Sequence, residues 1–156
     1  VIVILGILAS VAVPRLAGTK ADAEISAAVA NLRTLVSDAN VYYVAKGSFG
    51  TAPDIAKWNE VTNVPLKDHG GVPVTTELAT REAYLYVGDD MCIGVTLHNE
   101  AGTIPARIVF TTANSKVSSV CQKVRDAEPI KAYTKSELIK GLTGTMPIGS
   151  SIKLVR

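Results

Sequence analysis

The sequence predicts an α+β fold, in which a long N-terminal helix packs against a C-terminal antiparallel sheet of about four strands. Two patterns lead to this prediction. An uncharged apolar run over residues 1–13 passes into a helical apolar pattern that lasts to residue 46. Short segments rich in β-branched residues follow between residues 84 and 124. A chain of 156 residues suits one domain with an ordinary core.

The apolar run at the N-terminus carries no charge, and only Gly6 and Ser10 interrupt its apolar side chains. Spanning a bilayer takes about 20 apolar residues, so residues 1–13 are too few by themselves. A signal peptide would end in a small-residue cleavage site. Here the pattern passes Pro14 and enters an amphipathic helix, so we expect an anchor that is continuous with the domain.

The sequence VIVILGILASVAVPR, followed by a helix, resembles the N-terminal signature of type IV pilins and type II secretion pseudopilins. Gly6 and Pro14 align with recurrent positions of that family. The resemblance implies a ladle-shaped pilin fold with a methylated Phe and a glutamate at the start of the apolar run. About eight more residues are therefore expected before Val1, which would complete a membrane-spanning length.

The resemblance also implies two surroundings for the apolar half of the helix, the membrane before assembly and the core of a filament afterwards. The residues expected to take part are Val1, Ile2, Val3, Ile4, Leu5, Gly6, Ile7, Leu8, Val11, Val13 and Pro14. Pro14 removes a backbone donor and crowds the carbonyl of Ser10, which predicts a kinked or opened helix there. An ordinary kink is one interpretation. The other, implied by the family, is an extended segment between Gly6 and Pro14 in assembled pili.

The expected organisation separates a membrane or filament-core half, residues 1–14, from a globular domain, residues 15–156. In the globular domain a scaffold helix covers residues 15–46, and Gly47 is a natural stop for it. A connecting region follows over residues 48–83. The sheet is expected over residues 84–124 and a C-terminal region over residues 125–156.

The connecting region is interrupted by Pro and Gly. A short helix is predicted from Pro53 to Trp58, and a second over residues 76–83. Residues 68–71, Asp-His-Gly-Gly, predict a turn. Trp58 is expected to pack against the long helix rather than to stack on a ligand, because no basic or aromatic cluster surrounds it.

Strands are predicted over residues 84–87, 92–97, 106–112 and 117–124, joined as an antiparallel meander with one face on the helix. After them a short helix is predicted over residues 135–140, with Thr134 as its cap and Glu137 at the capping-box position. Residues 152–155 predict an edge strand.

Two cysteines, Cys92 and Cys121, lack a CxxC partner or a histidine at metal-ligand spacing. In an exported protein they are expected to form one disulfide, here between two strands of the sheet. Closing a loop of about 30 residues would contribute roughly 3–4 kcal/mol. Two buried free thiols in a cytosolic domain are the alternative. Pilins of the resembled family often carry such a bridge.

Candidate catalytic and metal-binding residues are few. His69 and His98 each stand alone in sequence that predicts loops. Asp89-Asp90 lacks the spacing of a calcium loop, although some pseudopilins bind calcium in this half of the fold. No Walker A, GxGxxG, GxSxG or HExxH motif occurs. We therefore expect no enzyme activity, no cofactor and no metal. The net charge of +2 does not indicate nucleic acid as a partner, although the more basic C-terminal region leaves it open.

These expectations combine into one preferred function and two alternatives. The preferred function is a structural subunit of a type IV pilus-like filament for adhesion, motility or DNA uptake. Such a subunit is anchored in the inner membrane, processed by a prepilin peptidase and assembled by the pilus machinery into an extracellular homo-oligomer. The alternatives are a periplasmic secretion pseudopilin and a membrane-tethered binding module or enzyme without a filament role.

Overall fold

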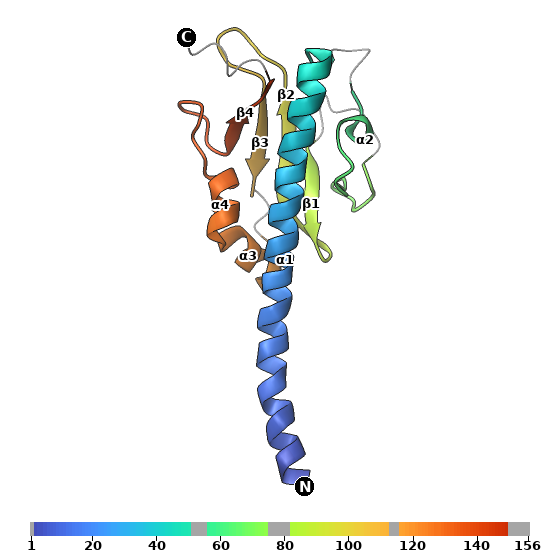
Figure 1. The fold of residues 1–156 in the computed structure, drawn as a ribbon, viewed down its shortest axis with the longest axis vertical. Helices are drawn as coiled ribbons and strands as arrows, with labels where there is room; N and C mark the ends of the chain where they lie inside the picture. The colour runs from blue at the N-terminus through green and yellow to red at the C-terminus, as the bar shows by residue number, and fades with distance from the viewer. Residues whose placement is uncertain (1, 51–55, 75–81, 113–115, 150–156) are drawn as a thin grey trace.

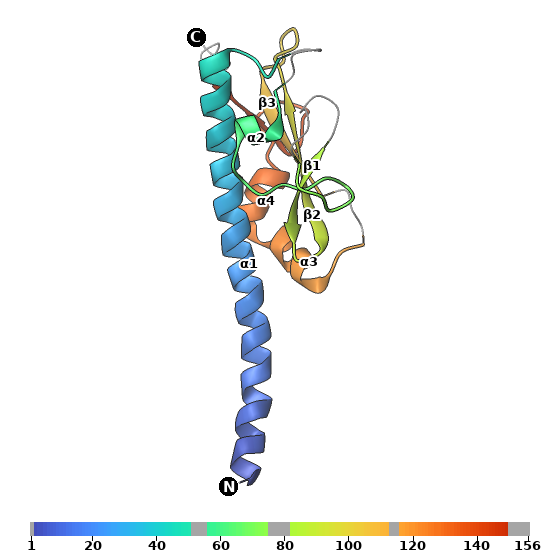
Figure 2. The same ribbon diagram turned by 90° about the vertical axis from the view of Figure 1, so that its right-hand side faces the viewer.

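The computed structural model describes residues 2–50, 56–74, 82–112 and 116–149, with side chains from Lys20 onward. Its longest element is α1 (Ile2–Lys46), a helix of 45 residues. At 1.5 Å per residue this is about 70 Å. The other elements gather around the C-terminal half of α1, while the N-terminal half projects from them (Figures 1 and 2). We call the C-terminal half of α1, together with all later elements, the head.

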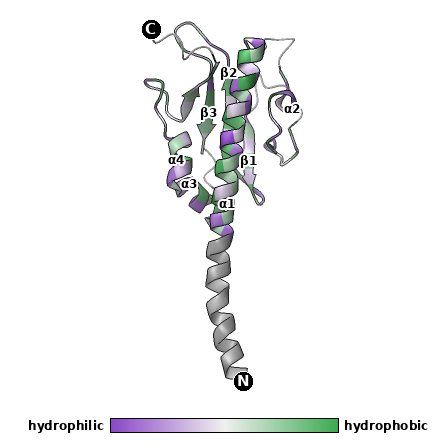
Figure 3. Cartoon of the chain, in the orientation of Figure 1, coloured by the Kyte–Doolittle hydropathy of each residue, from purple (hydrophilic) through white to green (hydrophobic). Residues whose placement is uncertain are grey.

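One face of α1 lies in the core of the head. Its buried residues recur mostly at three- and four-residue steps, as the sequence predicts; they are Ala21, Ala28, Leu32, Leu35, Ala39 and Tyr43. Figure 3 shows apolar and polar residues sharing this half of α1. The helix ends at Gly47, whose φ of 80° suits glycine and whose N–H donates to the Tyr43 carbonyl at 2.7 Å. The predicted scaffold helix and its stop are confirmed.

The backbone of α1 is helical through Gly6 and Pro14 without interruption. The predicted opening of the helix at Pro14 is therefore absent from the isolated chain. Proline within a helix removes one hydrogen bond, but the neighbouring turns can hold the helix together. An extended segment between Gly6 and Pro14 in an assembled filament stays a prediction.

The four-stranded antiparallel sheet is a meander in the order β1-β2-β3-β4. Its strands are β1 (Ala83–Val87), β2 (Asp90–His98), β3 (Arg107–Thr111) and β4 (Thr145–Pro147). The first three confirm the strands predicted over residues 84–87, 92–97 and 106–112, with small shifts of their ends. Along β1, Leu85 and Val87 are buried, whereas Tyr84 and Tyr86 lie on the opposite, partly exposed face.

The strand predicted over residues 117–124 is wrong, because this segment forms the helix α3 (Ser119–Asp126). The Ser118 side chain caps it by accepting the Cys121 N–H at 3.3 Å. Cys121 and Val124 are fully buried, one helical turn apart. Residues 117, 120, 121 and 124 already show this helical spacing in the sequence, but the three valines among them suggested a strand.

The C-terminal region also differs from its prediction. The helix α4 (Glu128–Thr134) has a proline in its first turn and ends at Thr134, which was expected to begin a helix over residues 135–140. The fourth strand of the sheet is β4, which pairs with β3 through Ile108 and Met146. The edge strand predicted over residues 152–155 lies outside the described residues.

In the connecting region the helix is α2 (Trp58–Val61), which begins where the predicted helix was expected to end. Residues 53–55 of that prediction, and residues 76–81 of the second predicted helix, lie outside the described residues; Ala83 begins β1 instead. Trp58 is 1% exposed in the core, as expected of a packing residue. The turn at residues 68–71 is confirmed by a hydrogen bond of 3.0 Å from the Gly71 N–H to the Asp68 carbonyl.

Hydrogen bonds join distant segments to the end of α1. The Thr62 hydroxyl, just after α2, donates to the Asp38 carboxylate at 2.6 Å. Asn40 accepts the Gly149 N–H at 2.7 Å. The connecting region and the C-terminal region are thus both fixed to the same helix.

The core face of α1 gives the first testable prediction. Leu35→Ala should lower the free energy of unfolding of the head by about 2–5 kcal/mol, because Leu35 is fully buried. Val41→Ala is the matched control, since Val41 is 65% exposed and should change stability by less than about 0.5 kcal/mol. Urea unfolding followed by circular dichroism measures both, and equal losses would contradict this packing.

Candidate functional site

The projecting half of α1 contains the residues expected to lie in a membrane or filament core. Ile2–Pro14 are part of this helix, and Val1 lies outside the described residues. The side chains of all of them also lie outside the described part. From Lys20 on, where side chains are described, no helix is long and apolar enough to cross a membrane.

The C-terminal half of α1 has a second face, opposite the core. Exposed, uncharged residues recur on it at alternating steps of four and three, a pattern typical of a helix that packs along another helix. We call them the small-residue stripe: Ala23, Ala27, Ala30, Thr34, Ser37, Val41 and Val44. Val41 and Val44 are about two-thirds exposed, at 65% and 64%. The prediction from sequence missed this stripe, although its spacing is visible there.

Small side chains matter on such a face because they let two helix backbones approach closely. Charged residues flank the stripe at Asp22 and Arg33 and do not interrupt it. The stripe therefore gives the scaffold half of α1 a surface suited to a second helix.

Cys92 and Cys121 form a disulfide that joins β2 to α3, with 5.7 Å between their Cα atoms. The expectation of a bridge between two strands is wrong, since Cys121 lies on a helix. Both cysteines are fully buried. The bridge fixes α3 against the sheet at the end of the head that faces the projecting half of α1 (Figure 2).

Polar contacts surround the disulfide. The Arg125 guanidinium donates to the Cys92 carbonyl at 2.8 Å and to the Met91 carbonyl at 3.4 Å. The Asp90 carboxylate accepts the Ser118 N–H at 2.9 Å. Hydrogen bonding by the side chain and backbone of Ser118 lowers the pKa of Asp90 below its ordinary value. β2 and α3 are thus held together by covalent and polar links.

The face of the sheet opposite α1 carries a second polar group of residues. Tyr84 donates its hydroxyl to the Glu82 carboxylate at 2.8 Å, and the Thr111 hydroxyl donates to the other oxygen of Glu82. Burial, followed by the bond to Glu82, raises the pKa of Tyr84 to about 12. Gly94 of β2 lies against these side chains, and a β-carbon on it would collide with Glu82 and Thr111.

One hollow near the β1–β2 turn is lined by three of the candidate residues from the sequence, His69, Asp89 and Asp90, and His98 does not line it. In the described ranges, no group of three or more His, Cys, Asp or Glu side chains could hold a metal ion. Asp89 and Asp90 lie at the β1–β2 turn, and Asp90 bonds to Ser118. His98 is the last residue of β2, not part of a loop as expected. Burial and then the nearby charge of Arg107 lower its pKa.

Comparisons of the chain with family models, with curated proteins and with solved structures found no match. We therefore infer a function from the geometry of α1 and of the head.

Removal of the disulfide gives a prediction for the head. The double substitution Cys92→Ser/Cys121→Ser should lower its free energy of unfolding by roughly 3–4 kcal/mol, because the unfolded chain loses a cross-link. Membrane insertion should not change, because both residues lie far along the chain from the apolar run. Urea unfolding with and without a reductant measures the effect. A reductant that weakens the variant as much as the wild type would contradict the bridge.

Tyr84 gives a prediction at high pH. In the unfolded chain a tyrosine releases its proton near pH 10, whereas Tyr84 in the head keeps it until about pH 12. Folded protein therefore binds more protons in this window, and its stability should fall as the pH rises from about 10 to 12. Absorbance titration of the phenolates should show late proton release, because burial raises the pKa of both Tyr84 and Tyr86, and Tyr84→Phe should reduce this late part. An unchanged titration in Tyr84→Phe would assign the late part elsewhere.

Proposed function

We propose that this chain is a structural subunit of a type IV pilus-like filament, with the ladle-shaped pilin fold, anchored in the inner membrane before assembly. One observation carries the proposal. The C-terminal half of α1 is built into the head, while its N-terminal half, which contains the uncharged apolar run, projects from it (Figures 1 and 2).

The apolar run must be shielded from water by something other than the head of the same chain. A Val, Leu or Ile side chain contributes about 1.5–3 kcal/mol when it is removed from water. The head gathers around the other half of the helix, so the cover must come from lipid or from other copies of the chain. A filament subunit uses both in turn.

The small-residue stripe supports a filament over a simple anchor. An anchor alone needs no second face on its scaffold half, whereas a subunit packed among helices does. Repetition of one contact between different surfaces, without closure, produces an open helical fibre. In the filament core the apolar run would contact helices of other copies. The stripe would extend these helix contacts along the head.

This function implies definite partners. A prepilin peptidase would process the chain at the inner membrane, and the assembly machinery would add it to an extracellular pilus used for adhesion, motility or DNA uptake. The chain itself would act by assembly, without catalysis.

Electron microscopy of sheared cell-surface fractions tests the proposal. Long filaments that contain this chain are expected from cells that express it with its assembly machinery. Ile7→Asp should abolish both membrane insertion and filaments, because it places a charge within the apolar run. A chain that inserts normally but never assembles would support the membrane-tethered alternative, and short assemblies that serve secretion would support the pseudopilin.

A matched pair of variants tests the stripe separately. Ala30→Glu places a charge on the stripe, and Ala132→Glu places the same charge at an exposed position of α4. Both should fold and insert into the membrane. Only Ala30→Glu should lose filaments, and normal filaments from it would exclude the stripe from the contact between copies.

A further inference from the structure

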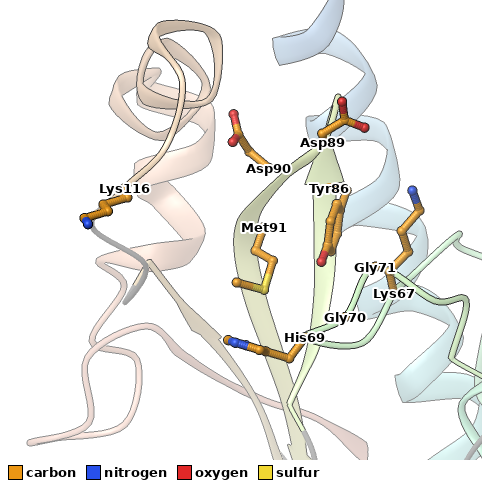
Figure 4. A pocket seen from close by; sticks show the side chains of 9 residues that line it. All are labelled: Lys67, His69, Gly70, Gly71, Tyr86, Asp89, Asp90, Met91 and Lys116. Carbon is orange, nitrogen blue, oxygen red and sulfur yellow. The ribbon is translucent and has the colours of Figure 1, made fainter.

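The face of the sheet opposite α1 has a hollow of about 530 Å³ near the β1–β2 turn. Figure 4 shows the side chains around it. They come from β1, from the start of β2, from the loop of residues 67–71 and from Lys116. The volume lies within the range of about 300–1,000 Å³ that is usual for small-ligand sites.

Two of the residues that line the hollow, Tyr86 and Met91, offer apolar side-chain surface. Tyr86 and Met91 are direct partners across β1 and β2, so their side chains lie next to each other on the same face. In Figure 4, Met91 lies on one side of the Tyr86 ring and Lys67 on the other. The Lys67 ammonium is 4.9 Å from the centre of the ring. An aromatic ring beside a thioether offers a flat surface to the C–H groups of a ligand.

One wall of the hollow is held in place by hydrogen bonds. Lys67 and Tyr84 exchange backbone bonds of 3.0 and 2.8 Å, which attach the loop to the edge of β1. The Asp68 carboxylate accepts the Gly70 N–H at 2.8 Å, and its backbone carbonyl accepts the Tyr86 hydroxyl at 3.0 Å. The wall is therefore formed before any ligand arrives, which reduces the entropy lost on binding.

The charges of the hollow select the chemical class of the ligand. Two lysines, Lys67 and Lys116, and two aspartates, Asp89 and Asp90, line it, so their formal charges cancel. An anionic ligand would meet the two carboxylates, and a cationic ligand would meet the two ammonium groups. A neutral ligand rich in hydroxyl groups can donate to the carboxylates and accept from the lysines and His69.

We propose that this hollow binds a sugar unit of a neutral glycan. The C–H face of the sugar ring would lie on Tyr86 and Met91. Its hydroxyl groups would bond to the Asp89 carboxylate and to the Lys67 ammonium. Asp89 is the more exposed of the two aspartates, because Asp90 bonds to Ser118. This site lies on the sheet and does not depend on the filament proposal.

Glycan-array screening of the full chain tests the inference. The protein is purified in a zwitterionic amine-oxide detergent, since a sugar-headed detergent would compete for the site. The array carries neutral and acidic glycans, and saturation-transfer NMR then measures the affinity of the best neutral one. Binding to neutral glycans is expected.

Three variants locate the binding. Asp89→Ala should weaken it about tenfold, the effect of one hydrogen bond to a charged group. Tyr86→Ala should abolish it, with thermal unfolding as the check that the head still folds. Glu100→Ala removes an exposed carboxylate just beyond the far end of β2 and should change affinity by less than about twofold.

Several results would overturn the inference. They are an array on which no neutral glycan binds, binding restricted to acidic glycans, and an affinity of Asp89→Ala equal to that of the wild type. Each can be obtained whether or not the chain forms filaments, so failure here leaves the filament proposal untouched.

Discussion

The structure depends on the burial of one face of α1 against the rest of the head. Leu32, Leu35 and Ala39 are fully buried on this face, in one core with both the sheet and the later helices. A sheet whose last strand has only three residues is a weak unit by itself. Without α1 its apolar face would meet water, and α3 and α4 would lose the helix that they contact. The scaffold half of α1 is thus the element that the other elements require in order to fold.

The packing of α1 against the head determines which of its sides can contact another molecule. One side of its scaffold half is occupied by its own head, so a neighbouring molecule can approach only along the exposed sides, which include the small-residue stripe. The N-terminal half has no such restriction, because the head does not surround it (Figures 1 and 2). The two halves of α1 therefore differ. The scaffold half packs against the head of the same chain, whereas the N-terminal half has no such cover within a single chain.

The sequence predicts well what is decided locally. The periodic helix with its glycine stop, the turn at residues 68–71 and three strands each rest on neighbouring residues, and the structure confirms them. The sequence predicts the structure poorly where contacts between residues far apart in the chain determine it. Residues 117–124 are rich in β-branched side chains, but Ser118 is held by Asp90, and Cys121 is bonded to Cys92. These contacts favour a helix over local strand preference. The hollow was missed for the same reason, since Lys67, Tyr86 and Met91 meet only in the folded chain.

The two faces of the sheet separate the two proposed activities. Alternation along β1 directs Leu85 and Val87 toward the core, and Tyr84 and Tyr86 away from it. A filament whose axis is lined by α1 helices would turn the second face, with its hollow, toward the outside. Each added copy would then add one more sugar site at a fixed spacing along the fibre. Weak binding at one site would become firm attachment when many sites engage a surface at once, because later contacts form at high effective concentration. The same helix packing that hides the apolar run would thereby determine how strongly the fibre adheres.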